Sequence, residues 1–204
     1  MSGTGQELEV KLYLSNLKVF QARLDSLGAC LYQTRTLETN LRFDTVYKDL
    51  SRSFQVLRLR QDEMARLTYK GPTEKIGGVS SRREIEFTVG DFEAARVLLE
   101  ALGYQIILIY EKYRTVYELD GVLVSLDELP YGDFSELEGP DVESIRAVAR
   151  KLGVNWDRRI PESYTDLFEH LRTKQGLSFR DLSFENFKSR SITAADLNVE
   201  PADA

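Results

Sequence analysis

Charged residues recur at every second position in one short segment after another, and this pattern restricts the fold more than any other feature of the chain. In Gln6–Leu14, the side chains of Glu7, Glu9 and Lys11 share one face of an extended chain, and leucine and valine residues occupy the other. The same spacing groups Arg58 with Arg60, Thr68 with Lys70, Arg82 with Glu84 and Glu86, Lys112 with Arg114, Ser125 with Asp127, and Glu136 with Glu138. One such strand is typical of a solvated face, but so many in one chain indicate a common cause.

Turn and cap residues divide the chain into strands and helices. The predicted strands are Gln6–Leu14, Leu31–Asp44, Ser53–Arg60, Ala65–Lys70, Ser81–Val89, Tyr104–Leu119, Val122–Asp127 and Asp133–Glu138. The predicted helices are Leu17–Gly28, Asp91–Leu102, Val142–Leu152 and Ser163–Arg172, the first two with Asn16 and Asp91 as N-caps. Many strands without alternating βαβ units favour an antiparallel barrel or sandwich.

The apolar faces of the helices need an apolar surface to pack against, and the apolar faces of the strands provide one. The charged faces of the strands then point inward. If the strands close into a barrel and not a sandwich, the chain has an α+β fold, a closed eight-stranded antiparallel β-barrel that forms a tunnel with helices packed outside; this is the fold that we predict. Unpaired charges inside it would each cost several kcal/mol, so both signs must be present and water must enter. An eight-stranded barrel has room for side chains or one small ligand.

Composition excludes several functional classes. The single cysteine and single histidine argue against a structural zinc site, a Ser-His-Asp triad and a Cys-His pair, so we expect a bound metal to be a hard cation held by carboxylates. The net charge of -6 argues against nucleic-acid binding. No apolar run reaches the length of a membrane span, and Met1–Gln6 lacks the features of a signal peptide. We expect a cytoplasmic protein without membrane or nucleic-acid partners.

The two signs of charge suggest what the tunnel binds. Lysine and arginine side chains from several strands converge on a compact polyanion, and the forked donors of arginine suit phosphate oxygens. Carboxylates cannot contact a polyanion directly, but they can hold Mg²⁺ or Mn²⁺, which bridges to phosphate. The pattern thus predicts a metal–polyphosphate site.

Glu7-Leu8-Glu9-Val10-Lys11 resembles the Glu-x-Glu-x-Lys signature of the CYTH family, the triphosphate tunnel metalloenzymes. That family includes class IV adenylyl cyclases, thiamine triphosphatases and inorganic triphosphatases. The similarity extends from Glu7 to about Arg172. Further matches, in family order, are Phe43-Asp44-Thr45 with Leu50, Leu57-Arg58-Leu59-Arg60, Leu67-Thr68-Tyr69-Lys70-Gly71-Pro72, Arg82-x-Glu84-x-Glu86, Glu111-Lys112-x-Arg114, Leu126-Asp127, Phe134-x-Glu136-x-Glu138 and Ser163-Tyr164-x-Asp166-Leu167.

The resemblance implies a role for each matching residue. The implied metal ligands are Glu7, Glu9, Glu136 and Glu138, with Asp127 as a further candidate. The implied phosphate-binding residues are Lys11, Arg58, Arg60, Lys70, Arg82, Lys112 and Arg114, of which Lys11, Lys70 and Lys112 are the candidate catalytic groups. Glu84 and Glu86 resemble partners that orient the basic residues.

The favoured activity is metal-dependent hydrolysis of a triphosphate, whether inorganic triphosphate, thiamine triphosphate or a nucleoside triphosphate. A class IV adenylyl cyclase that converts ATP to cyclic AMP and pyrophosphate is the alternative, and a non-catalytic polyphosphate or nucleotide sensor is the second alternative. Residues 1–173 are predicted to form the tunnel domain. Residues 174–204 are predicted to form a partly ordered extension with a frayed end at Glu200–Ala204, which packs over a tunnel mouth or binds a second subunit in a homodimer.

Overall fold

The computed structural model of the protein describes residues 3–204, so Met1 and Ser2 of the segment Met1–Gln6 lie outside it. The strands are β1 (Gly3–Leu14), β2 (Cys30–Thr45), β3 (Val56–Gln61), β4 (Ala65–Lys70), β5 (Glu74–Ile76), β6 (Val79–Val89), β7 (Tyr104–Leu119), β8 (Val122–Leu129) and β9 (Gly132–Glu138). The helices are α1 (Leu17–Ser26), α2 (Asp49–Arg52), α3 (Phe92–Ala101), α4 (Val142–Lys151), the 3₁₀ turn η1 (Trp156–Arg158), α5 (Tyr164–Gln175) and α6 (Phe184–Phe187). None of the helices in this range has the length and apolar character that a bilayer span requires.

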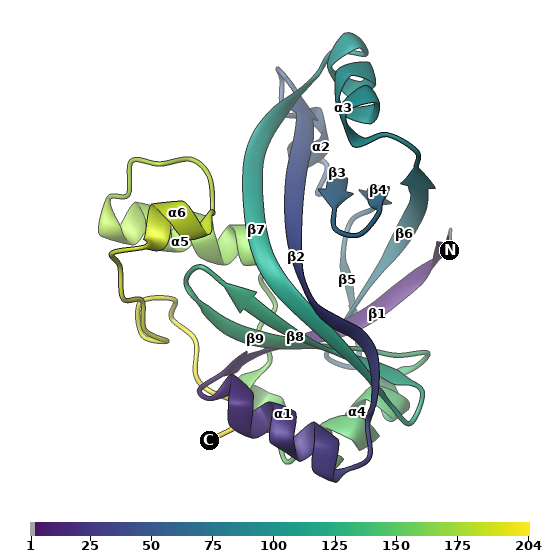
Figure 1. Cartoon of the computed structure of the whole chain (residues 1–204), viewed down its shortest axis with the longest axis vertical. Helices are drawn as coiled ribbons and strands as arrows, with labels where there is room; N and C mark the ends of the chain where they lie inside the picture. The colour runs from purple at the N-terminus through teal and green to yellow at the C-terminus, as the bar shows by residue number, and fades with distance from the viewer. Residues whose placement is uncertain (1–2) are drawn as a thin grey trace.

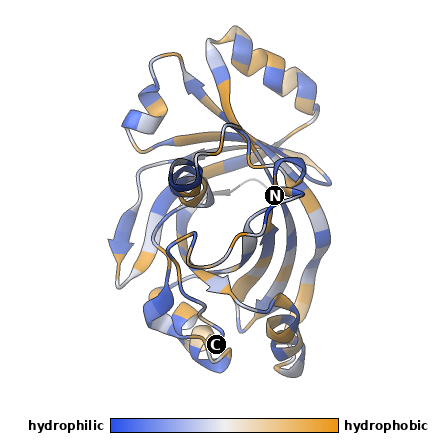
Figure 2. Cartoon of the chain, turned by 90° about the vertical axis from the view of Figure 1, so that its left-hand side faces the viewer, coloured by the Kyte–Doolittle hydropathy of each residue, from blue (hydrophilic) through white to orange (hydrophobic). Residues whose placement is uncertain are grey.

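Eight of the strands form a closed antiparallel barrel. Their order is β1-β9-β8-β7-β2-β3-β4-β6, and pairing of β6 with β1 closes the ring, while the short strand β5 adds to β6. The long strands β2 and β7 run side by side along one wall (Figure 1), and Figure 2 shows the strands forming a ring. The predicted α+β fold, a closed eight-stranded antiparallel barrel with helices outside, is confirmed.

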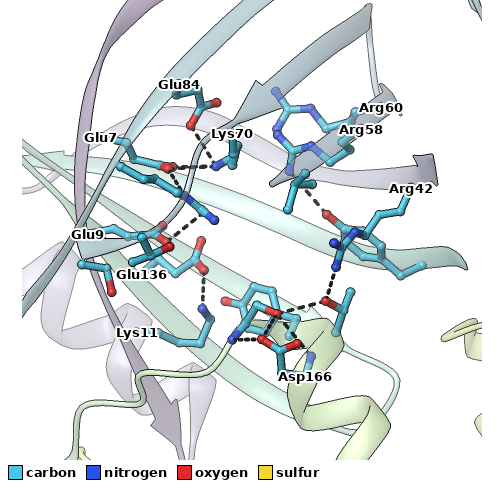
Figure 3. A pocket seen from close by; sticks show the side chains of 18 of the residues that line it. Glu7, Glu9, Lys11, Arg42, Arg58, Arg60, Lys70, Glu84, Glu136 and Asp166 are labelled. Carbon is cyan, nitrogen blue, oxygen red and sulfur yellow. Dashed lines mark hydrogen bonds and ion pairs between the residues drawn. The ribbon is translucent and has the colours of Figure 1, made fainter. Parts of the chain in front are cut away.

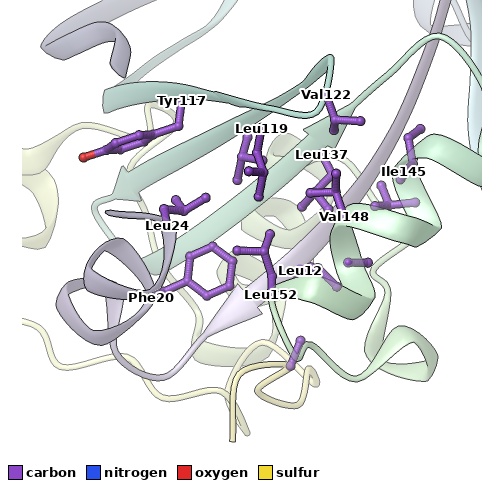
Figure 4. Close-up of a cluster of buried hydrophobic side chains, with 14 of the residues drawn as sticks. Leu12, Phe20, Leu24, Tyr117, Leu119, Val122, Leu137, Ile145, Val148 and Leu152 are labelled. Carbon is purple, nitrogen blue, oxygen red and sulfur yellow. The ribbon is translucent and has the colours of Figure 1, made fainter. Parts of the chain in front are cut away.

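The apolar faces of the strands point outward, as the alternation predicted. Helices α1 and α4 pack on the outer faces of β1, β8 and β9 (Figure 4), where Leu12, Phe20, Leu24 and Ile145 are each 0% exposed. Burying a side chain of this kind contributes about 1.5–3 kcal/mol. A second apolar cluster fixes α3 against β2 and β3. The helices therefore supply the core that a barrel with a charged interior lacks.

The helix N-termini at Asn16 and Asp91 are capped as predicted. The Asn16 side chain accepts a hydrogen bond from the Val19 N–H, and Asp91 accepts one from the Ala94 N–H. Such caps satisfy backbone donors that have no partner within the helix.

The predicted strand Ser53–Arg60 begins late, at Val56, because the backbone N–H groups of Phe54 and Gln55 still donate hydrogen bonds to carbonyls of the short helix α2. The carboxylate of Asp44, which is fully buried, accepts hydrogen bonds from the backbone N–H groups of Leu50 and Ser51. These bonds turn the chain after β2 and delay the next strand.

The C-terminal residues pack against the barrel, and the prediction of a frayed end at Glu200–Ala204 was wrong. Leu182 forms backbone hydrogen bonds with Ile109 and Glu111 of β7, along a stretch of that strand that β8 does not cover. The Ala202 N–H donates to the Tyr13 carbonyl, and Ala202 is 0% exposed. The apolar residues of this segment follow no regular period, so the sequence pattern could not predict their burial.

Candidate active site

A cavity of about 1590 Å³ occupies the interior of the barrel. It is lined by eleven of the twelve predicted site residues: Glu7, Glu9, Lys11, Arg58, Arg60, Lys70, Arg82, Lys112, Arg114, Glu136 and Glu138. The twelfth, Asp127, is fully buried behind this lining. The strands bring these side chains together because every second residue of each strand faces the axis of the barrel.

One set of ion pairs, here called the glutamate-rich group, comprises Glu7, Glu9, Lys70, Arg82 and Glu84 (Figure 3). The Lys70 ammonium lies 2.7 Å from Glu7 and 2.8 Å from Glu84. The Arg82 guanidinium lies 2.8 Å from Glu7 and 3.2 Å from Glu9. Burial alone would raise the pKa of Glu7, but Lys70 and Arg82 outweigh burial and hold that pKa far below its usual value. Glu7 is therefore ionised and fixed in position.

A second chain of ion pairs, the belt, runs from β1 through β9, β8, β7 and β2 to β3 and β6. Its successive distances are Lys11–Glu136 3.2 Å, Glu136–Arg114 2.6 Å, Asp127–Lys112 3.1 Å, Lys112–Glu38 3.6 Å, Glu38–Arg60 3.4 Å, Arg60–Glu86 3.4 Å and Glu86–Arg58 3.5 Å, and Arg114 also pairs with Asp127. Burial opposes ionisation of Glu38, but Lys112 and Arg114 lower its pKa to about 2. Lys11 and Arg114 likewise outweigh burial and hold the pKa of Glu136 well below its usual value. Alternating charges thus stabilise one another around the wall.

Asp127 and Tyr164 anchor helix α5 to the belt. The Tyr164 hydroxyl donates to Asp127 over 2.8 Å, and the ammonium groups of Lys11 and Lys112 lie 4.4 Å and 5.3 Å from the centre of the Tyr164 ring. Because Lys112, Arg114 and Tyr164 already occupy the Asp127 carboxylate, its metal-ligand role stays a prediction. Helix α5 is thereby part of the tunnel wall.

Two carboxylates of the cavity fit a hard divalent cation. Glu9 and Glu138 are paired directly across β1 and β9, and Glu138 forms no ion pair within residues 3–204. Burial, Glu7 and Glu9 raise the pKa of Glu138 to about 7, and burial, Glu136 and Glu7 raise that of Glu9. A cation with a preference for oxygen ligands would relieve this repulsion. Within residues 3–204, no three acidic, histidine or cysteine side chains already lie close enough together to hold a metal ion. Glu9 and Glu138 are therefore a partial set of metal ligands in this arrangement.

The structure adds site residues that the sequence reasoning missed. Glu38, Arg42 and Tyr110 line the same cavity. Glu38 and Arg42 continue the alternation within the predicted strand Leu31–Asp44, and this spacing could have identified them. The sequence pattern gives Tyr164 only as part of the family motif Ser163-Tyr164-x-Asp166-Leu167.

The CYTH domain family model matches residues 5–164. Among solved structures, a candidate adenylate cyclase of Vibrio parahaemolyticus is 21% identical with a TM-score of 0.71, and the alignment covers 80% of this chain and 97% of that one. A protein of Pyrococcus horikoshii is 27% identical with a TM-score of 0.67, covering 80% and 98%. A candidate adenylyl cyclase of Hippeastrum, described as having a dominant triphosphatase activity, is 21% identical with a TM-score of 0.61, covering 80% and 95%. No curated protein matches the chain.

Proposed function

The chain belongs to the CYTH family, and on that premise we propose that it hydrolyses a triphosphate inside the tunnel with the help of a divalent metal ion. The observation that supports this most is the lining of the cavity. Basic side chains from six strands and carboxylates from β1 and β9 face the same space. A polyanion and a cation can therefore be bound side by side.

The basic residues would bind the phosphates. Arg58 and Arg60 follow one another on the inner face of β3, and each has donors that suit phosphate oxygens. The ammonium groups of Lys11, Lys70 and Lys112 would stabilise the charge that develops on the leaving phosphate. Lys11 is held for this by Glu136 and by the Glu162 carbonyl, which accepts a hydrogen bond of 3.3 Å.

The carboxylates Glu7, Glu9, Glu136 and Glu138 would hold Mg²⁺ or Mn²⁺. When bound, such an ion supplies charge neutralisation at the transferring phosphoryl group and lowers the pKa of water. Arg82 contacts both Glu7 and Glu9, so it sets the orientation of these two carboxylates.

Cyclisation of ATP is the second candidate function. The Vibrio and Hippeastrum proteins carry adenylate cyclase descriptions, and the dominant triphosphatase activity described for the Hippeastrum protein favours hydrolysis over cyclisation. The two reactions can use the same phosphate-binding groups and differ in the nucleophile, which is water for hydrolysis and the ribose 3′-hydroxyl for cyclisation. The products therefore distinguish them.

The test is product identification by chromatography after incubation with inorganic triphosphate, thiamine triphosphate or ATP, each with Mg²⁺ or Mn²⁺. Release of orthophosphate supports the proposal, whereas cyclic AMP with pyrophosphate supports the cyclase. Binding without turnover would identify a sensor. Glu9→Gln and Lys11→Ala should abolish turnover with unchanged circular dichroism, and full activity in either variant would refute the assigned site.

A further inference from the structure

Arg42 differs from the other basic residues that line the cavity from the strands, because it pairs with no carboxylate of residues 3–204. It lies on β2 and lines the cavity, and within residues 3–204 its guanidinium takes part in no ion pair. Its hydrogen bond goes to the Thr165 hydroxyl of α5 over 2.6 Å (Figure 3). A guanidinium has five N–H donors, so most of its donors are free to meet a ligand or water.

A neighbouring cation adds positive charge beside Arg42. Arg58 is the direct partner of Arg42 in the β2–β3 register, and both side chains line the cavity. The nearest carboxylate of Arg58, that of Glu86, lies 3.5 Å away and also pairs with Arg60. Burial lowers the pKa of Arg42, and the more distant attraction of Tyr110, Asp166 and Asp44 does not offset this effect. An oxyanion between the two guanidinium groups would supply that compensation.

This position is distant from the glutamate-rich group. Pairing across β2, β3, β4 and β6 aligns Arg42 with Glu86, whereas Glu7 is aligned with Arg82. Arg82 and Glu86 are four residues apart on β6, which corresponds to ~13 Å along the strand. Figure 3 accordingly places Arg42 across the cavity from Glu7 and Glu9.

We propose that Arg42 and Arg58 form an oxyanion subsite on the β2–β3 side of the cavity, across from the glutamate-rich group. The proposal rests on the function proposed above. A polyphosphate whose first phosphates lie near Glu7 and Glu9 would extend past Lys70 and Arg58. Arg42 would then bind one further phosphate group of the same chain. The occupant is either a phosphate beyond the third of a linear chain or a free phosphate.

The test measures binding by titration calorimetry in metal-free buffer, with orthophosphate, tripolyphosphate and tetrapolyphosphate as separate ligands. The variant Arg42→Met keeps the apolar stem and removes the charge, and Arg42→Lys restores it. Thr165→Val is the matched control, because it removes the hydrogen bond to α5 and leaves the guanidinium in place. Thermal melting shows whether each variant folds.

We expect Arg42→Met to weaken tetrapolyphosphate binding by about tenfold or more, the loss typical of one charge-assisted hydrogen bond. Tripolyphosphate binding should change by less than about threefold, and Arg42→Lys should recover part of the loss. If orthophosphate instead loses affinity and the two chains do not, the occupant is a free phosphate.

Equal losses for Arg42→Met and Thr165→Val would show that Arg42 serves to hold α5, and would overturn the proposal. So would equal losses on tripolyphosphate and tetrapolyphosphate, or no change with any ligand. A wild-type chain that binds these ligands and never hydrolyses them would contradict the proposed function and leave this subsite intact.

Discussion

Replacing Lys70 with methionine tests whether the ion pairs inside the barrel maintain its wall. The Lys70 side chain is 10% exposed, and its ammonium lies 2.7 Å from Glu7 and 2.8 Å from Glu84. Methionine keeps a stem of similar length and removes the charge, so the two carboxylates lose the cation between them.

The expected cost follows from the burial of these groups. Removing one partner of a buried ion pair costs about 3–5 kcal/mol, because the remaining charge stays out of water. Arg82 remains 2.8 Å from Glu7, which favours the lower end, about 3 kcal/mol. For a chain of this length each kcal/mol lowers Tm by ~2–4 °C, so Tm should fall by ~6–12 °C.

The loss of stability in Lys70→Met should also depend on pH, and the pKa values of Glu7 and Glu84 determine its direction. The folded-state pKa of Glu84 is raised, chiefly by burial, even with Lys70 present, and it should rise further without Lys70. A carboxyl with a raised pKa favours the folded state at low pH and loses that contribution as the pH rises through its folded pKa. The pKa of Glu7 is lowered, so its contribution is present above its unfolded value of 4.5. Lys70→Met should therefore cost more at about pH 8 than at about pH 5.

Urea unfolding at both pH values measures these costs. The control is Lys151→Met: the Lys151 ammonium lies 2.6 Å from Asp120, but the two side chains are 54% and 51% exposed. An exposed pair contributes at most about 1 kcal/mol. If Lys70→Met costs no more than Lys151→Met, or costs the same at both pH values, the reasoning about the tunnel wall is wrong.

Three further variants test other parts of the structure. Phe20→Ala removes a side chain that is 0% exposed between α1 and the barrel, and should cost about 3–5 kcal/mol in urea unfolding without changing polyphosphate affinity in calorimetry. Burial and Glu128 raise the pKa of Asp133 to about 6, so its contribution to stability is lost as the pH rises from 3.8 through that value. Asp133→Asn should therefore raise Tm at about pH 8 and leave it unchanged at about pH 4, by thermal melting. Tyr164→Phe removes the 2.8 Å hydrogen bond to Asp127 and should cost about 1–3 kcal/mol in urea unfolding, with a fall in kcat/KM because the position of Lys112 depends on Asp127.

A barrel with charged side chains inside and apolar side chains outside could be predicted from the sequence, because the alternation of charged and apolar residues is a local pattern. A period of two fixes which side chains share a face, and the charges at Glu7, Glu9 and Lys11 showed which face is polar. The apolar helices then required that this face point inward. Eleven charged residues of the cavity lining followed directly.

What the sequence did not predict depends on contacts between distant segments. The roles of Arg42 and Glu38 depend on which strands flank β2, and closure of the barrel fixes that register. Helix α2 forms because Asp44 binds backbone N–H groups that follow it in the chain. The C-terminal segment is ordered by contacts with β7 and with Tyr13, which no sequence periodicity shows.

The ion pairs also bear on how a substrate could enter. Lys70, Arg82 and Arg60 already contact carboxylates, so a polyanion that bound them alone would displace Glu7 or Glu86 and leave that carboxylate buried without compensation. A divalent cation bound by the displaced carboxylates removes this cost, so metal and polyphosphate should each strengthen the binding of the other by the same factor. Arg42 needs no such exchange, because it forms an ion pair with no carboxylate in the described part of the chain, residues 3–204. Binding at Arg42 should therefore depend less on metal than binding at the glutamate-rich group.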